Sequence, residues 1–175
     1  MPLNVALFLA LTGSELDSRD ALALGVATNQ FRSLDYTSLL KRLSGLGYSA
    51  DREHNHELMD SFFQPEYQGK SVPPGPWVKV PEWKFDLEDA SKTFEQLLAI
   101  PGGDPWVDAA KDNLSSGCPM SAAITVEQLR RAKDLGVARC FQMELKIASR
   151  CIQLPDFPEG VRALLIDKDK QPTWT

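Results

Sequence analysis

Apolar residues recur every three or four positions along most of the chain, which is the spacing of helices that bury one face. The first such segment stops at Gly13 and carries apolar residues at Leu3, Ala6, Leu7, Ala10 and Leu11. Nothing resembling an N-cap precedes Leu3, so the pattern predicts a chain that opens inside a helix. A short helix follows, with Asp17 or Ser18 as its expected cap and Gly25 as its end.

The same spacing predicts a series of further helices and, apart from one stretch, no strand. They are expected at residues 36–46, 53–63, 86–100, 105–114, 120–131 and 137–152. Asp86 is the expected cap of the helix that runs through Ile100. The exception is residues 26–31, the one stretch with a strand-like pattern.

The last helix has a start signal of its own. Asp156 is expected to cap it, with Pro158 in its first turn and Glu159 completing a capping box. Its expected buried stripe is formed by Val161, Leu164 and Leu165.

A proline-rich connection interrupts the helical pattern at residues 65–81. It holds five prolines and two glycines, a composition that predicts an extended connection instead of a helix or an inner strand. Because Trp77 and Trp83 accompany it, we expect this segment to pack on a surface.

Charge and cysteine content exclude several classes of function. A net charge of −5, with no block of Lys or Arg longer than two, gives no footprint for nucleic acid or an anionic membrane. No targeting or membrane-spanning segment is visible. Cys140 and Cys151, on one predicted helix, are typical of buried thiols in a reducing compartment.

Candidate chemistry is sparse. His54 and His56 are two residues apart and point to different faces of a helix, which favours a solvated segment over a metal site. Cys118 precedes a helix start, but both histidines are far from it in sequence, so we expect an inert thiol. No complete catalytic set is visible. Lys168 and Lys170 are either a solvated end or point charges that meet the phosphates of a nucleotide-like ligand.

Ordered motifs along nearly the whole chain resemble a known family. They are Leu9-Ala10-Leu11-Thr12-Gly13, Asp20-Ala21 with Gly25-Val26-Ala27, Ser121 with Thr125, Gln128-Leu129-Arg130, Met143-Glu144, Arg150-Cys151, and the run from Asp156-Phe157 through Glu159-Gly160-Val161-Arg162 to Asp167-Lys168-Asp169 with Pro172 and Trp174. This combination resembles the 3-hydroxyisobutyryl-CoA hydrolases of the enoyl-CoA hydratase/isomerase, or crotonase, superfamily. The C-terminal run separates this branch from ordinary hydratases, which share only the Glu159-Gly160 part.

The resemblance implies a fold and a missing half. The chain would be mainly α, the C-terminal helical region of a crotonase-like (ClpP/crotonase) fold, with the ββα-spiral core and the catalytic residues upstream and absent. Residues 1–31 would end that core, and residues 32–175 would form a helical cap and packing region. No catalytic or metal-binding residue is assigned, and Asn29, where relatives often carry His, receives no role.

The same resemblance implies the chemistry. The complete protein would be a thioesterase of valine catabolism that cleaves 3-hydroxyisobutyryl-CoA, with CoA as part of the substrate and no separate cofactor. Lys168 would contact the CoA phosphates. The partners would be the acyl-CoA, the chain's own N-terminal core half and identical chains in an oligomer, in the mitochondrial matrix of a eukaryote or the cytoplasm of a bacterium.

Two alternatives stay open. One is a helical interaction or oligomerisation module without chemistry, because no catalytic set is present. The other is a hydratase or isomerase of the same superfamily that acts on another acyl-CoA.

Overall fold

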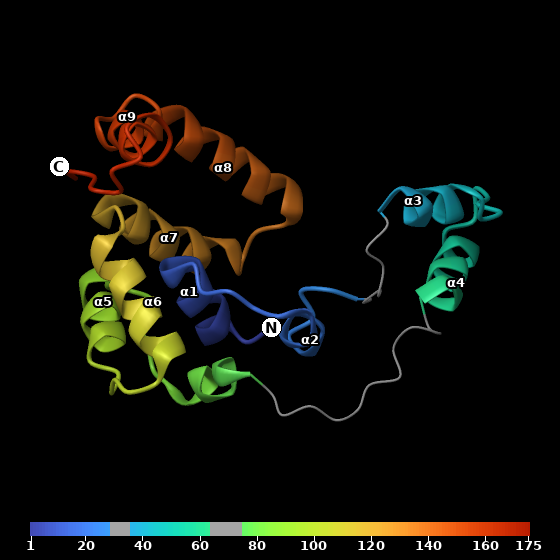
Figure 1. The fold of residues 1–175 in the computed structure, drawn as a ribbon, viewed down its shortest axis with the longest axis horizontal. Coiled ribbons are helices and arrows are strands. Elements are labelled where there is room, and N and C mark those ends of the chain that lie inside the picture. The colour runs from blue at the N-terminus through green and yellow to red at the C-terminus, as the bar shows by residue number, and fades with distance from the viewer. Residues whose placement is uncertain (29–35, 64–74) are drawn as a thin grey trace. The chain divides into compact units, whose positions relative to one another are not determined.

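A computed structural model of the protein describes residues 1–28, 36–63 and 75–175 (Figure 1). Within those residues every regular element is helical, which confirms the mainly α prediction. The elements are α1 (Leu3–Thr12), α2 (Ser18–Ala23), α3 (Tyr36–Ser44), α4 (Arg52–Phe63), the 3₁₀ helix η2 (Pro76–Glu82), α5 (Ala90–Leu98), α6 (Pro105–Ser116), α7 (Pro119–Ala132), α8 (Val137–Cys151), α9 (Asp156–Val161) and the π-helical turn η3 (Arg162–Ile166). None of these helices is both long and apolar enough to cross a membrane.

The described residues fall into two compact units. One comprises residues 1–2 and 15–79, and the other comprises residues 3–14 and 80–175. The predicted boundary after residue 31 stays a prediction.

In the first unit, one carboxylate ties α2 to the tryptophan-bearing segment. Asp17 caps α2 as expected, accepting from the backbone N–H groups of Arg19 and Asp20. The Asp20 carboxylate accepts from Trp77 Nε1 at 2.7 Å and from the backbone N of Gly75 at 3.0 Å. Trp77 is therefore half-buried and hydrogen-bonded to α2. This agrees with the prediction that the tryptophan-bearing segment packs on a surface.

The helices α3 and α4 form a hairpin in the same unit. Ser49 N donates to Asn55 Oδ1, and Asn55 Nδ2 donates back to Ser49 O, both at 2.9 Å. The Arg42 guanidinium lies 4.8 Å from the centre of the Phe62 ring, close enough for a cation–π contact.

The second unit is built around α1, which packs on α6 and α7, while α5 packs on α7 (Figure 1). Val5, Leu7 and Phe8 have no exposed surface. The Phe8 ring stacks on Trp106 at 4.8 Å and is tilted against Trp83 at 5.4 Å. These aromatic contacts confirm that Trp83 is packed.

The predicted buried face of α1 is only partly right. Leu7 and Leu11 are buried, but Leu3 and Ala10 are exposed, and Val5 and Phe8 are buried in their place. The stripe was wrong because α6, α7 and the tryptophans enclose more of α1 than one face.

The start of α5 also differs from the prediction. Asp89, not Asp86, is its N-cap, with its carboxylate accepting from Ser91 N and Lys92 N. Asp86 Oδ1 accepts from Glu88 N in the preceding turn, so its side chain is already committed before the helix begins.

Two predicted segments lie partly outside the described residues. For the strand-like stretch, residues 29–31 are outside them, and residues 26–28 form neither helix nor strand. For the proline-rich connection, residues 65–74 are outside them, while Pro76–Glu82 form a 3₁₀ helix instead of the expected extended backbone.

Candidate functional site

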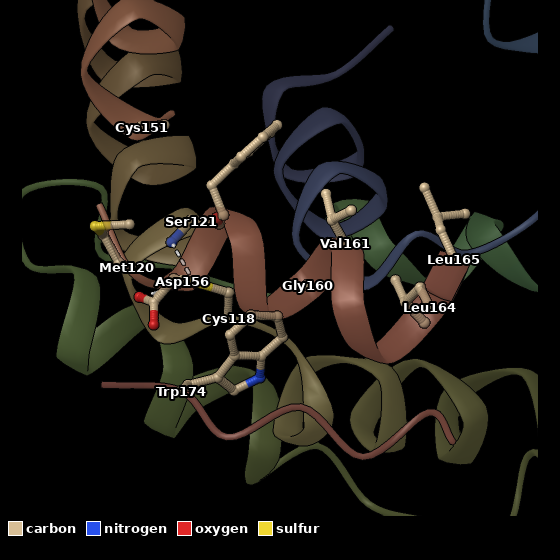
Figure 2. A pocket seen from close by; sticks show the side chains of 11 residues that line it. Cys118, Met120, Ser121, Cys151, Asp156, Gly160, Val161, Leu164, Leu165 and Trp174 are labelled. Atoms are coloured by element: carbon tan, nitrogen blue, oxygen red, sulfur yellow. Dashed lines mark hydrogen bonds between the residues drawn. The ribbon is translucent and has the colours of Figure 1, made fainter. Parts of the chain in front are cut away.

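A cavity of about 320 Å³ lies at the C-terminal end of the second unit (Figure 2). The start of α7 supplies Cys118 and Ser121, and α9 supplies Phe157 and Val161. Trp174 lines it as well. Most of the lining is apolar, and Asp156 is its carboxylate.

The Asp156 side chain is almost fully buried and fully hydrogen-bonded. Its Oδ1 accepts from the backbone N of Thr175 at 2.9 Å and from Thr175 Oγ1 at 3.0 Å, and its Oδ2 accepts from Cys118 Sγ at 3.5 Å. The backbone hydrogen bond from Thr175 is the main reason that the pKa of Asp156 lies below its usual range. This carboxylate is therefore ionised at neutral pH and suits a structural contact better than proton transfer.

The predicted capping box is wrong. Asp156 is the first residue of α9, Pro155 precedes it, and no side chain caps the helix. The carboxylate of Glu159 is instead turned to Arg162 and to the backbone N of Thr173, at 2.7 Å from the latter. The carboxylates of Asp156 and Glu159 therefore accept hydrogen bonds from the C-terminal segment of the chain instead of capping α9.

Arg162 makes five hydrogen bonds at this end of the chain. Its guanidinium binds Glu159 through two nitrogens, at 2.8 and 2.9 Å. It also donates to the carboxylates of Asp167 at 2.6 Å and Asp169 at 2.7 Å. A fifth contact goes to the carbonyl oxygen of Gln171 at 3.1 Å, so the five N–H donors of arginine suit this position better than the ammonium of lysine.

The ion cluster changes the titration of its members. Hydrogen bonds from Arg162, and then from the Thr173 backbone, lower the pKa of Glu159 to about 2. The Arg162 contact likewise lowers the pKa of Asp169, and these carboxylates raise the pKa of Arg162 itself. Glu159, Asp169 and Arg162 are therefore charged across the physiological range.

Lys168, the predicted CoA-phosphate residue, follows η3 in this segment. Lys168 and Lys170 both have φ of 57°, a left-handed backbone that residues other than glycine seldom adopt. Both side chains are exposed. Among the residues that the structure describes, no carboxylate lies within ion-pair distance of Lys168, whereas its neighbours Asp167 and Asp169 both bind Arg162.

The other sequence candidates lie elsewhere. His54 and His56 are exposed on α4 in the first unit. Over residues 1–28, 36–63 and 75–175, no group of three or more His, Cys, Asp or Glu side chains is arranged to hold a metal ion. Cys140 and Cys151 are half-buried, where the sequence predicted buried thiols. Cys118 is the cysteine that sequence reasoning left inert, and it is the one that joins a hydrogen-bonded cluster.

Large apolar side chains next to the site are exposed. The predicted stripe of the last helix is wrong, because Leu164 and Leu165 are 58% and 68% exposed, and Ala163 is buried instead. A row along α8 is exposed as well, formed by Val137, Phe141 and Leu145 at four-residue spacing, and Ile152 just after the helix is also exposed. Such a contiguous row is typical of a surface that packs on something else.

The amino-acid pattern of the enoyl-CoA hydratase/isomerase family matches residues 1–175. The chain belongs to the enoyl-CoA hydratase/isomerase family. This finding confirms the superfamily that the C-terminal motifs indicated.

Curated relatives within this family carry one recurrent name. The mitochondrial 3-hydroxyisobutyryl-CoA hydrolase of Dictyostelium discoideum is 30% identical over 175 residues, covering 99% of this chain and 45% of the relative. That of Danio rerio is 29% identical, covering 98% and 44%. The 3-hydroxyisobutyryl-CoA hydrolase 1 of Arabidopsis thaliana is 28% identical, covering 95% and 45%. The chain thus spans less than half the length of these relatives, and it matches their C-terminal part.

The sequence motifs include Glu159 and Arg162, but their contact with each other was not predicted. Glu159 and Arg162 are three apart, the spacing of an ion pair on one helix face, and this signal competes directly with the capping box. Nothing in the local sequence indicates that Thr173 and Thr175 would return to bind α9.

Proposed function

We propose that this chain is the C-terminal part of a 3-hydroxyisobutyryl-CoA hydrolase and is inactive without the upstream part. The observation that carries the proposal is the coverage of the matches, since relatives with this name align along nearly the entire chain. In the proposed reaction water adds to the thioester carbonyl, the C–S bond breaks, and CoA leaves as the thiol. The free acid would feed valine breakdown.

The geometry supports inactivity of the chain alone. Thioester hydrolysis needs hydrogen-bond donors aimed at the carbonyl oxygen and a group that handles the proton of water. The buried carboxylate of the cavity, Asp156, has both oxygens occupied, and Glu159 is held by Arg162. Neither is available as a base, so the reacting groups would come from the upstream part.

The exposed apolar row of α8 supports a packing role. Phe141 and Leu145 are about two-thirds exposed, and burying a side chain of this size stabilises an assembly by about 1.5–3 kcal/mol. In the proposal this row and the exposed end of η3 pack on the upstream part or on an identical chain. The names of the animal relatives include the word mitochondrial, which supports a mitochondrial location for a eukaryotic source; the matrix is our proposal.

Two assays test the proposal. The chain alone and the chain co-expressed with the upstream half of its own gene are compared for release of free CoA from 3-hydroxyisobutyryl-CoA. We expect release only from the pair. Failure of the folded pair to release CoA would contradict the hydrolase assignment, and release from other acyl-CoA thioesters or their hydration instead would favour a different member of the family.

Lys168 is proposed to contact the CoA phosphates. The Lys168 side chain is exposed, and its backbone is in the left-handed conformation. Arg162 holds the preceding residue, Asp167, by a hydrogen bond. In the active pair, Lys168→Ala should weaken CoA binding, whereas Lys146→Ala, which removes another exposed charge, from α8, should not. Unchanged CoA affinity in Lys168→Ala, with loss in Lys170→Ala, would transfer the role to Lys170.

A second function, an interaction module without chemistry, is favoured by the same α8 row. It predicts that the chain associates by itself in a concentration-dependent way. Sedimentation of the double variant Phe141→Lys/Leu145→Lys, with Gln142→Lys on the polar face of α8 as the control, identifies the surface. A stable monomer at every concentration would contradict this reading.

A further inference from the structure

Residues 167–175, here called the strap, make a series of polar contacts with α9 and η3. Arg162 binds two strap carboxylates and one strap carbonyl. Glu159 accepts from the backbone of Thr173, and Asp156 accepts from Thr175. The strap itself has no regular secondary structure. A segment held in this way can detach without disrupting the buried helices.

Trp174 places the strap over the cavity. Its indole lines the cavity together with Cys118 (Figure 2). Its Nε1 donates to the carbonyl oxygen of Ser116 at 3.0 Å. A Cβ at Gly160 would lie only 3.3 Å from Trp174 Cη2, so the ring packs directly against the bare backbone of α9.

The backbone of the strap does not hold this path by its own preference. Lys168 and Lys170 both have φ of 57°, which brings the Cβ of an L-residue close to its backbone. Two backbone hydrogen bonds, Asp167 N to Arg162 O and Lys170 N to Ala163 O, return the chain toward η3. The closed path therefore depends on its attachments to α9 and η3.

We propose that the strap opens and closes over the cavity as a unit, with Arg162 as its latch and Trp174 as the cover of the Cys118 thiol. In the closed form Trp174 completes the apolar wall. In the open form the cavity would admit an apolar group from outside. The inference rests on the contacts of this region alone and is independent of the reaction of the larger protein.

Arg162 is the latch because its one guanidinium binds three carboxylates at once. Without it, Glu159, Asp167 and Asp169 would face one another with like charges, and the strap would be repelled from α9. Arg130 provides a matched comparison, since it makes the same two-nitrogen contact with Glu127 three residues before it on α7, while its other ion pair goes to Glu88 and not to the strap.

The test measures how fast a soluble disulfide reagent modifies Cys118 in the 175-residue chain carrying Cys140→Ser and Cys151→Ser. Arg162→Gln should accelerate modification by about tenfold or more, because the rate follows the population of the open form. Trp174→Ala, which removes the cover and keeps the latch, should accelerate it as well. Far-UV circular dichroism should show the same helix content in each variant.

Arg130→Gln is the control and should react at the rate of the parent chain. Equal acceleration in Arg130→Gln would overturn the proposal, because any lost glutamate–arginine pair would then loosen the cavity. Parent-like rates in both Arg162→Gln and Trp174→Ala would also overturn it. If Arg162→Gln loses its helices, Trp174→Ala alone decides between the two results.

Discussion

Helix α1 and the C-terminal end of the chain are both held in the same compact unit, but by opposite means. Around α1 the contacts are apolar and buried, with Phe8 enclosed by Trp83 and Trp106. At α9 and η3 the contacts are ionic and exposed, centred on Arg162, and large apolar side chains face outward. The α1 region buries most of its large apolar side chains within the unit, whereas the C-terminal end exposes several of them, which is typical of a packing surface.

The largest expected difference concerns two phenylalanines. Phe8→Ala should lower the free energy of unfolding by about 3–5 kcal/mol, because it empties a fully buried site between two tryptophans. Phe141→Ala on α8 should change it by no more than about 0.5 kcal/mol. Urea unfolding measures both, and equal losses would erase the distinction between the two regions.

A smaller difference in the free energy of unfolding is expected between two hydroxyl groups, those of Thr93 and Ser149. Thr93 has no exposed surface, and its Oγ1 donates to the carbonyl oxygen of Asp86, so Thr93→Val should cost about 1–3 kcal/mol. Ser149 Oγ makes a similar bond to Leu145 O, but on the exposed side of α8. Ser149→Ala should therefore stay within about 0.5 kcal/mol in the same urea experiment. A cost at Ser149 that matched Thr93 would mean that α8 is already covered.

The N-caps of α5 and α8 are also expected to differ in their effect on stability. Asp89→Ala removes a carboxylate that binds two backbone N–H groups of α5 and should cost about 1 kcal/mol. The N-cap of α8 is Gly136, which makes no side-chain contact and has open space around it. Gly136→Asp should stabilise the chain by roughly a few tenths of a kcal/mol. Thermal melting tests both, and a destabilising Gly136→Asp would contradict this description of α8.

The smallest effect is the acid response of the strap. Since the pKa of Glu159 falls from 4.5 to about 2 on folding, its contribution is complete above pH 4.5 and is lost as the pH falls through about 2. The lowered pKa values of Asp156 and Asp169 act in the same direction, and Arg162 stays charged throughout. The amide resonance of Thr173, followed by NMR, should therefore titrate near pH 2. A midpoint near 4.5 would mean that Glu159 does not bind Arg162 in solution.

The sequence predicts local features of the fold better than contacts between distant segments. Local signals placed most helix ends correctly, because a cap or a proline acts within a few residues, as at Asp17 before α2 and at residue 105, the proline that begins α6. The cap of α5 was wrong because Asp86 and Asp89 both precede it, and the chain uses the first one in a turn. Local reasoning distinguishes such pairs poorly.

Long-range contacts were not predictable in this way. The capping box at Asp156 and Glu159 fits the local pattern, but residues 14 and 19 positions later in the chain take both carboxylates. The burial of Phe8 depends on tryptophans about 75 to 100 residues away. The expected burial of Leu164 and Leu165 failed because their apolar spacing reports a buried face without saying which part of a protein covers it.

The most direct test of the central claim is the mass of the native gene product in cells of the source organism. A product about twice as long as this chain is predicted, because the chain corresponds to 45% of its Dictyostelium relative. A native product of only this length would contradict the proposal that the chain is the C-terminal part of a hydrolase. The exposed side chains of α8 would then belong to an interaction module.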